Sequence, residues 1–420
     1  MFFVSASTTD PDLGSALASL EEQVNLQARQ QLGDALPPEW IDLAIVFVSS
    51  HFTQPVRLIV DKLRADLKPG VLLGCTAEGV IGASQEIEDV PAITLVAASL
   101  PGVVAAPFLL LPSDANLPAL TWSPHLIAGQ PDWPRLLLDV EEFRRMVDAP
   151  ENPELFILLG DPFSTPMDDV LQAFNTYFSG VPVVGGMASG ALRPSGNALW
   201  VNDQITFEGA VGVGLAGPLE VDVVVSQGCR PIWRPMKVVN AHRNLIFNLE
   251  GRTPLAWLQE LLPELSEEER LLLQNGLFIG RAIKPGQENL GRGDFLLRGV
   301  VGLDQNSGAL AIGDSIMEGE TIQFHLRDAL TATEDLEMML ITQVFRGPPS
   351  GALLFTCNGR GTRLYDHPNG DISVIQANLD VAHLAGFFCA GEIGPIGGVN
   401  FLHGHTVSLA IFRPKPDQTA

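Results

Sequence analysis

The chain has 420 residues, of which 46% are hydrophobic and 18% are charged, and its formal net charge at pH 7 is -24. This length predicts two or three domains with sizeable cores, and the acidic charge argues against nucleic acid and membranes as partners. The 4 cysteines are too few for a disulfide scaffold and form no C-x-x-C pair. The start of the chain lacks a basic leader, and no segment approaches the ~20 apolar residues of a membrane span. We therefore expect a soluble, cytoplasmic protein.

The first 38 residues are predicted to form an N-terminal helix and a linker. Residues 13–31 have the spacing of an amphipathic helix. Residues 33–41 contain Pro37 and Pro38 and predict a connection into the first strand.

One unit occurs three times, at residues 43–82, 155–190 and 352–398: apolar strand, polar loop, helix, apolar strand and glycine-rich turn. The two strands of each unit start about 30 residues apart, which is the length of a crossover that brings the second strand back parallel to the first. The first two helices each carry an apolar stripe, made of Val56, Ile59, Val60, Leu63 and Leu67 in one and Met167, Val170, Leu171, Phe174 and Phe178 in the other.

Strand-like segments follow the first two units and predict mixed sheets. Residues 92–100 and 103–111 are separated by Pro101 and Gly102 and predict a hairpin. Residues 112–134 contain five prolines without periodicity and predict a long loop excursion that is either functional or disordered.

A second half begins near Gln227. Thr253 before Pro254 predicts the start of one helix, and Ser266 with Glu269 predicts a capping box for the next. A further helix is expected from Glu334 to Phe345.

Strands in this half are expected at 294–304 and 309–316, joined as a hairpin, and at 320–329. In the last of these, Gln323, His325 and Arg327 share one face. We interpret that face as solvated in preference to a pocket wall.

These elements predict an α/β fold with mixed α+β character. It would consist of two lobes of mixed sheets covered by helices, built on repeated β-α-β units followed by antiparallel strands.

The candidate site residues lie in the turns at the carboxyl ends of the repeated strands, where ligands of parallel sheets usually bind. They are Cys75, Glu78, Gly185, Gly186, Cys357, Asn358, Arg360, Cys389 and Glu392. Cys75 and Cys389 occupy matching positions, and each has a glutamate three residues on.

Two interpretations of these cysteines stay open. As nucleophiles they would need a thiolate, a neighbouring base and an oxyanion hole, and no histidine spacing specifies such a base. As small apolar residues at strand ends they need none of this, and we favour that interpretation.

Arg360 and Asn358 form the most promising polar group, because arginine presents a rigid fork to a carboxylate or phosphate. We expect Arg360 to hold a ligand carboxylate and Glu392 or Glu78 a ligand amine. A tight turn whose arginine pairs with surface acids is an equal alternative.

No cofactor or metal site is expected. The segments CNGRG and VVGGMASG match neither a phosphate loop nor a dinucleotide fingerprint. His403 and His405 share a strand face, but no third ligand spacing accompanies them.

The segment at residues 386–412, GFFCAGEIGPIGGVNFLHGHTVSLAIF, resembles the carboxy-terminal part of the FIST family, named for F-box and intracellular signal transduction proteins. The resemblance covers about residues 40–413 and continues through 294–329, 353–361, 74–82, 183–190 and 226–258. Besides the candidate residues above, the matching motif positions include Gly74, Gly359, Gly361, Gly391 and Gly394.

This resemblance implies a sensory module that binds small ligands such as amino acids, at a pocket where the amino- and carboxy-terminal halves face each other. The expected partners are a small-molecule ligand and a signalling protein. Two alternatives are a protein-interaction scaffold that uses residues 112–134 and a cysteine-dependent enzyme. The predicted domains are 39–226 (FIST N) and 227–413 (FIST C), followed by a disordered tail at 414–420.

Overall fold

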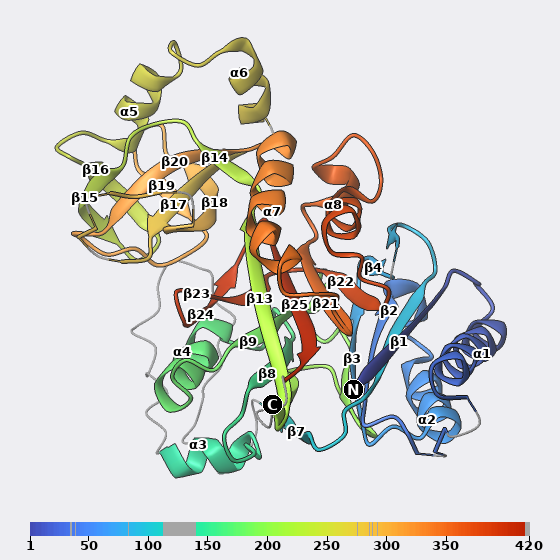
Figure 1. The fold of residues 1–420 in the computed structure, drawn as a ribbon. Coiled ribbons are helices and arrows are strands. Elements are labelled where there is room, and N and C mark those ends of the chain that lie inside the picture. The colour runs from blue at the N-terminus through green and yellow to red at the C-terminus, as the bar shows by residue number, and fades with distance from the viewer. Residues whose placement is uncertain are drawn as a thin grey trace. The chain divides into compact units, whose positions relative to one another are not determined.

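A computed structural model describes residues 1–33, 36–37, 39–82, 84–111, 140–274, 276–284, 286–287, 289–291 and 293–415. The predicted excursion at 112–134 and most of the predicted tail lie outside the described residues. The chain forms two compact units (Figure 1). The first comprises Met1–Val225, Met339–Leu402 and Val407–Ala420, and the second comprises Ser226–Met338 and His403–Thr406.

The three predicted crossovers are confirmed, and all lie in the first unit. In each, the two strands pair in parallel; in the first, Leu43 lies opposite Val71 and Ser49 opposite Ala77. The elements are β2 (Leu43–Ser49), α2 (Val56–Leu67) and β3 (Val71–Ala77); β8 (Leu155–Gly160), α4 (Met167–Tyr177) and β9 (Val183–Met187); β21 (Gly351–Cys357), α8 (Gly370–Leu379) and β22 (Leu384–Cys389).

The crossover strands belong to three six-stranded sheets of the first unit, ordered β1-β6-β2-β3-β10-β11, β24-β23-β9-β8-β12-β7 and β13-β25-β21-β22-β4-β5. Parallel and antiparallel pairs occur together in each, so the predicted mixed α/β architecture is confirmed. The other strands are β1 (Phe2–Thr8), β4 (Val80–Ile81), β5 (Glu86–Ile87), β6 (Ile93–Ser99), β7 (Val104–Leu110), β10 (Leu199–Val201), β11 (Gln204–Thr206), β12 (Ala210–Ala216), β13 (Leu219–Gln227), β23 (Glu392–Ile396), β24 (Val399–His403) and β25 (Thr406–Pro414).

The predicted hairpin across Pro101 and Gly102 is wrong. Strand β6 pairs with β1 on one edge and β2 on the other, so it has no edge left for β7, which pairs with β12 in another sheet. Strand β1 was not among the predicted elements. The predicted N-terminal helix is confirmed as α1 (Leu13–Leu32), and α3 (Val140–Met146) precedes β8.

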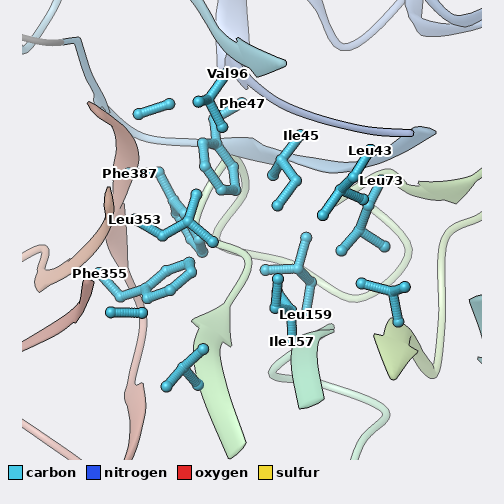
Figure 2. Packing of buried hydrophobic residues seen from close by; sticks show 14 of the residues in the cluster. Leu43, Ile45, Phe47, Leu73, Val96, Ile157, Leu159, Leu353, Phe355 and Phe387 are labelled. Atoms are coloured by element: carbon cyan, nitrogen blue, oxygen red, sulfur yellow. The ribbon is translucent and has the colours of Figure 1, made fainter. Parts of the chain in front are cut away.

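A buried hydrophobic cluster joins strands of all three sheets (Figure 2). Phe47 of β2 lies 4.7 Å from Phe387 of β22, ring centroid to ring centroid, and 6.1 Å from Phe355 of β21. Ile157 and Leu159 of β8 belong to the same cluster. Because each fully buried side chain of this size contributes roughly 1.5–3 kcal/mol, the three crossovers stabilise one another.

The second unit contains a barrel. Its strands are β14 (Cys229–Pro231), β15 (Met236–His242), β16 (Leu245–Leu249), β17 (Leu277–Ala282), β18 (Phe295–Leu303), β19 (Leu310–Ile312) and β20 (Thr321–Arg327). The sheet closes because β20 pairs with both β15 and β17, and β14 adds to the other end of β20. Closure leaves fewer exposed edges than an open sheet of this length would have. The predicted hairpin of β18 and β19 is confirmed.

Helices α5 (Pro254–Leu261) and α6 (Glu267–Gln274) begin where the sequence predicts. The side chain of Thr253 accepts a hydrogen bond from Ala256 N, and Ser266 and Glu269 form the reciprocal capping box at 2.8 and 3.1 Å. Helix α7 (Ala329–Val344) starts five residues before the predicted Glu334. Asp328 accounts for the earlier start, because its carboxylate accepts from Leu330 N and Thr331 Oγ1.

Within the part of the chain that the structure describes, no helix is both long enough and apolar enough to cross a membrane.

Candidate functional site

The turns that contain the predicted site residues lie together in the first unit. Met187 N donates to Gly391 O at 2.8 Å, and Ala390 N donates back to Met187 O at 2.9 Å. Strand β23 pairs with β9, with Glu392 opposite Gly186. Phe388 N donates to Gly79 O, which joins the turn after β3 to the same cluster. The carboxyl ends of β3, β9 and β22, one from each crossover, therefore meet at one place.

The thiols at this place are packed in the protein interior. Cys75 and Cys389 have no exposed surface, and burial raises the pKa of both. A methyl group at Gly186 would lie 2.4 Å from Cys389 Sγ, so the glycine makes room for the thiol. Cys357 lies opposite Cys389 in the pairing of β21 with β22. This environment favours thiols over thiolates and agrees with small apolar residues at strand ends.

Arg360 is buried completely, and its guanidinium binds groups of the protein itself. Nε donates to Asp371 Oδ2 at 2.8 Å, and Nη2 donates to Asp371 Oδ1 at 2.6 Å and to the Tyr365 hydroxyl at 2.9 Å. Burial opposes ionisation of Asp371, but the charge of Arg360 and the hydrogen bonds outweigh it and lower the pKa of the carboxyl. The fork that the sequence suggested for a ligand carboxylate is thus occupied by Asp371.

Glu86 of β5 approaches this ion pair from the amino-terminal half of the chain. Its Oε1 accepts from Ile372 N at 2.9 Å, while Oε2 has no donor among the described residues. Burial and the nearby charge of Asp371 raise the pKa of Glu86 to about 7. Sequence reasoning missed Glu86, Asp371 and Tyr365, because none of them belongs to a motif.

The remaining predicted residues differ in exposure. Glu78 forms an ion pair with Arg363, whose side chain is 53% exposed, and its backbone N donates to Ser189 Oγ at 2.9 Å. Asn358 is half-buried, and its carbonyl accepts from Arg363 Nη1 at 2.7 Å. Glu392 is buried completely in β23, and Gly185 lies opposite Ile393. The arrangement is a closely packed junction of strand ends.

A cavity of about 140 Å³ lies in the second unit instead. Its walls come from the end of β13, from β14, β18, β20 and α7, and from the loop before β18. They are formed by Gln227, Cys229, Pro231, Leu290, Gly291, Gly293, Phe295, Gln323, His325 and Asp335. The preference for a solvated face at Gln323 and His325 is therefore wrong. The loop before β18 and the start of α7 cover this face of β20, and the strand pattern alone could not show that.

His325 is one of two deeply buried titratable groups of the cavity, with 4% of its surface exposed. Its ring lies against Gly280, where a methyl group would come within 2.4 Å of Cε1. Nδ1 lies 3.1 Å from Gln323 O, and because a carbonyl only accepts, Nδ1 carries the proton. Burial lowers the pKa of His325 to about 4, so the ring is neutral at pH 7 and Nε2 is an acceptor.

Asp335 of α7 is the second buried titratable group, also 4% exposed. Its Oδ2 accepts from Ser226 Oγ and from Gln227 N, both at 2.8 Å. These bonds fix the carboxylate at the wall of the cavity, which Cys229, with 5% of its surface exposed, also lines. Among the described residues, no group of three or more histidine, cysteine, aspartate or glutamate side chains could hold a metal ion.

Comparison with known proteins identifies the family. The FIST N domain matches residues 42–252 and the FIST C domain matches residues 254–395. The chain therefore belongs to the FIST family, whose domains are sensory domains associated with signal transduction. The division between the matched domains, near residue 253, differs from the division between the compact units, after Val225. The predicted domain boundaries stay a prediction.

Two relatives show how much of the chain is shared. The uncharacterized protein MT0656 of Mycobacterium tuberculosis (strain CDC 1551 / Oshkosh) is 38% identical over 96% of this chain and 98% of its own length. The uncharacterized protein Mb0898c of Mycobacterium bovis (strain ATCC BAA-935 / AF2122/97) is 38% identical over 93% of this chain and 95% of its own length. The chain is thus similar to these proteins over both domains.

Proposed function

We propose that this protein is a small-ligand-binding sensory module and that the cavity of the barrel unit holds the ligand. The observation that carries this proposal is a space of about 140 Å³ lined by two side chains that are both more than nine-tenths buried, His325 and Asp335. A molecule of liquid water takes about 30 Å³, so the cavity suits a metabolite of a few non-hydrogen atoms. A ligand that hydrogen-bonds these groups replaces the water they lose on burial.

The proposal places the ligand site away from the turn cluster of the first unit. Arg360 already binds Asp371 and Tyr365 there, and the thiols of Cys75 and Cys389 are enclosed by side chains and backbone. Ligand binding by the nine residues of the sequence prediction stays a prediction. Amino acids, the ligands first expected, are one class to be tested.

We place the protein in the cytoplasm and assign it no catalysis. All four cysteines are buried thiols outside any disulfide, which suits a reducing compartment. The raised pKa of Cys75 and Cys389 argues against a cysteine nucleophile. The scaffold alternative depends on residues 112–134, which lie outside the described part of the chain.

Alkylation of Cys229 tests the location of the ligand site. A panel of small metabolites is first screened for a rise in melting temperature of the full-length protein. Each hit is then added during treatment with iodoacetamide, and the modified cysteine is located by peptide mass spectrometry. A ligand in the cavity slows modification of Cys229 and leaves the rate at Cys357 unchanged. A stabilising ligand that does not alter the rate at Cys229 contradicts the proposed location.

A further inference from the structure

The cavity of the barrel unit presents hydrogen-bond acceptors on several of its walls. Gln227 Nε2 donates to Phe295 O at 2.6 Å, and Gln323 Nε2 donates to Trp233 O. Because both partners are carbonyls, the orientation of each side-chain amide is fixed. The Oε1 atoms of these two glutamines receive no hydrogen bond from any described residue.

The two buried titratable groups add two more acceptors. His325 uses its only N–H for Gln323 O, which leaves the lone pair of Nε2. Asp335 receives both of its hydrogen bonds at Oδ2, and within the described ranges no donor reaches Oδ1. A backbone donor of the wall, Gly291 N, is already bound to Asp294 Oδ2 at 2.8 Å.

A wall of this kind selects ligands by their donors. A primary ammonium group brings three N–H donors and a positive charge and has no acceptor. A carboxylate brings only acceptors and a negative charge, so Asp335 and the glutamine oxygens repel it. The formal net charge of -24 also raises the concentration of cations at the surface of the protein.

We infer that the ligand of this cavity is a small organic cation with N–H donors, that is, a primary alkylammonium of a few carbon atoms. This inference rests on the proposed function and narrows its ligand class. In the complex the ammonium donates to Asp335 Oδ1 and His325 Nε2, and the short carbon chain lies against Phe295 and Pro231. An α-amino acid is a poorer ligand because its carboxylate lies among acceptors.

Calorimetric titration of the full-length protein tests this ligand class. The ligands are ethylammonium, tetramethylammonium, acetate and glycine, each at the same ionic strength. We expect ethylammonium to bind, and we expect tetramethylammonium, which has no N–H, and acetate to bind at least about tenfold more weakly. If glycine or acetate binds and ethylammonium does not, the cavity is a ligand site but the inferred class is wrong. If none of these ligands nor any member of a broader metabolite panel binds, the proposed function fails as well.

Two variants of helix α7 distinguish the effect of the negative charge in the cavity from the effect of a negative charge on the protein surface. Asp335→Asn keeps the shape of the side chain and an acceptor for Ser226, and we expect it to weaken ethylammonium binding at least about tenfold. Glu337→Gln removes one charge from the exposed side of the same helix and serves as the matched control. Equal affinity in Asp335→Asn and the wild type overturns the inference.

A second measurement on the wild type covers the case in which Asp335→Asn does not fold. Ethylammonium should slow the alkylation of Cys229, which lines the same cavity, whereas acetate at the same concentration should not. Equal protection by the two ions, or protection by acetate alone, contradicts the inferred class.

Discussion

Replacing Arg360 by alanine tests whether this arginine supports the fold of the first unit. The side chain has no exposed surface, and its hydrogen bonds include two to the carboxylate of Asp371 and one to the hydroxyl of Tyr365. Asp371 also accepts from Thr356 Oγ1 at 2.7 Å. Removing the guanidinium leaves the buried carboxylate of Asp371 near Glu86, with the neutral hydroxyls of Thr356 and Tyr365 as side-chain donors.

The expected loss of stability is large. Breaking a buried ion pair by removing one partner costs about 3–5 kcal/mol, because the remaining charge stays buried without compensation. Urea unfolding followed by circular dichroism measures this as a lower midpoint with an unchanged slope. Arg360→Met combined with Asp371→Leu removes both charges and should restore most of the loss.

Arg363→Ala is the matched control, because this arginine follows three residues later and pairs with Glu78 at the surface. An ion pair of that exposure contributes about 0–1 kcal/mol. If Arg360→Ala lowers the free energy of unfolding no more than Arg363→Ala does, Arg360 does not stabilise the fold. The expectation that it holds a ligand carboxylate then regains support.

Three further predictions concern the first unit. Glu86→Gln should flatten the pH dependence of the free energy of unfolding, measured by urea unfolding from pH 5 to 8. Because the pKa of Glu86 is about 7 in the folded state against the ordinary value of 4.5, the folded state binds more protons between these values and wild-type stability falls as pH rises. Relative to the wild type, the variant therefore gains on the order of 3 kcal/mol at pH 8. Equal slopes in both proteins contradict this. Gly186→Ala should lower stability by about 1–3 kcal/mol, because the added methyl group meets Cys389 Sγ, and a neutral effect on the melting temperature argues against the close packing. Phe47→Ala should lower the free energy of unfolding by about 3–5 kcal/mol in the same urea assay, since the ring packs against Phe355 and Phe387 of two other strands. A loss below about 1 kcal/mol would disagree with the buried cluster.

Local patterns were sufficient to predict the crossovers and several caps. The apolar stripes of α2 and α4 have helical spacing, and their flanking strands are continuous apolar runs, so each unit can be recognised without its neighbours. The capping box at Ser266 is equally local. These features depend on residues close together in the chain.

Pairings between distant segments were not predictable in the same way. The hairpin at Pro101 failed because β1, far earlier in the chain, takes the edge of β6 that β7 was expected to use. Closure of the barrel likewise depends on the pairing of β17 with β20, although residues 283–320 separate the two strands and their spacing carries no signal of the pairing.

The candidate site was predicted only in part, because some of its residues are brought together by segments that are distant in the sequence. The turns of the three units do meet, as the carboxyl ends of parallel strands suggested. The chemistry of Arg360 was visible in the sequence, but its partner Asp371 lies inside helix α8 and belongs to no motif. The cavity was missed because its walls come from four strands, a loop and helix α7, which only the fold brings together.

Nitrogen NMR of His325 tests the central claim most directly, because this ring lines the proposed ligand site. The chain has 8 histidines, and the His325 signals are assigned by their loss in His325→Gln. Ethylammonium is then titrated into protein labelled with ¹⁵N-histidine. We expect the Nε2 signal of His325 to start at the position of an unprotonated acceptor and to shift with saturation, while the other assigned histidines stay unchanged. A ligand that stabilises the protein but leaves this signal in place would show that the ligand binds elsewhere.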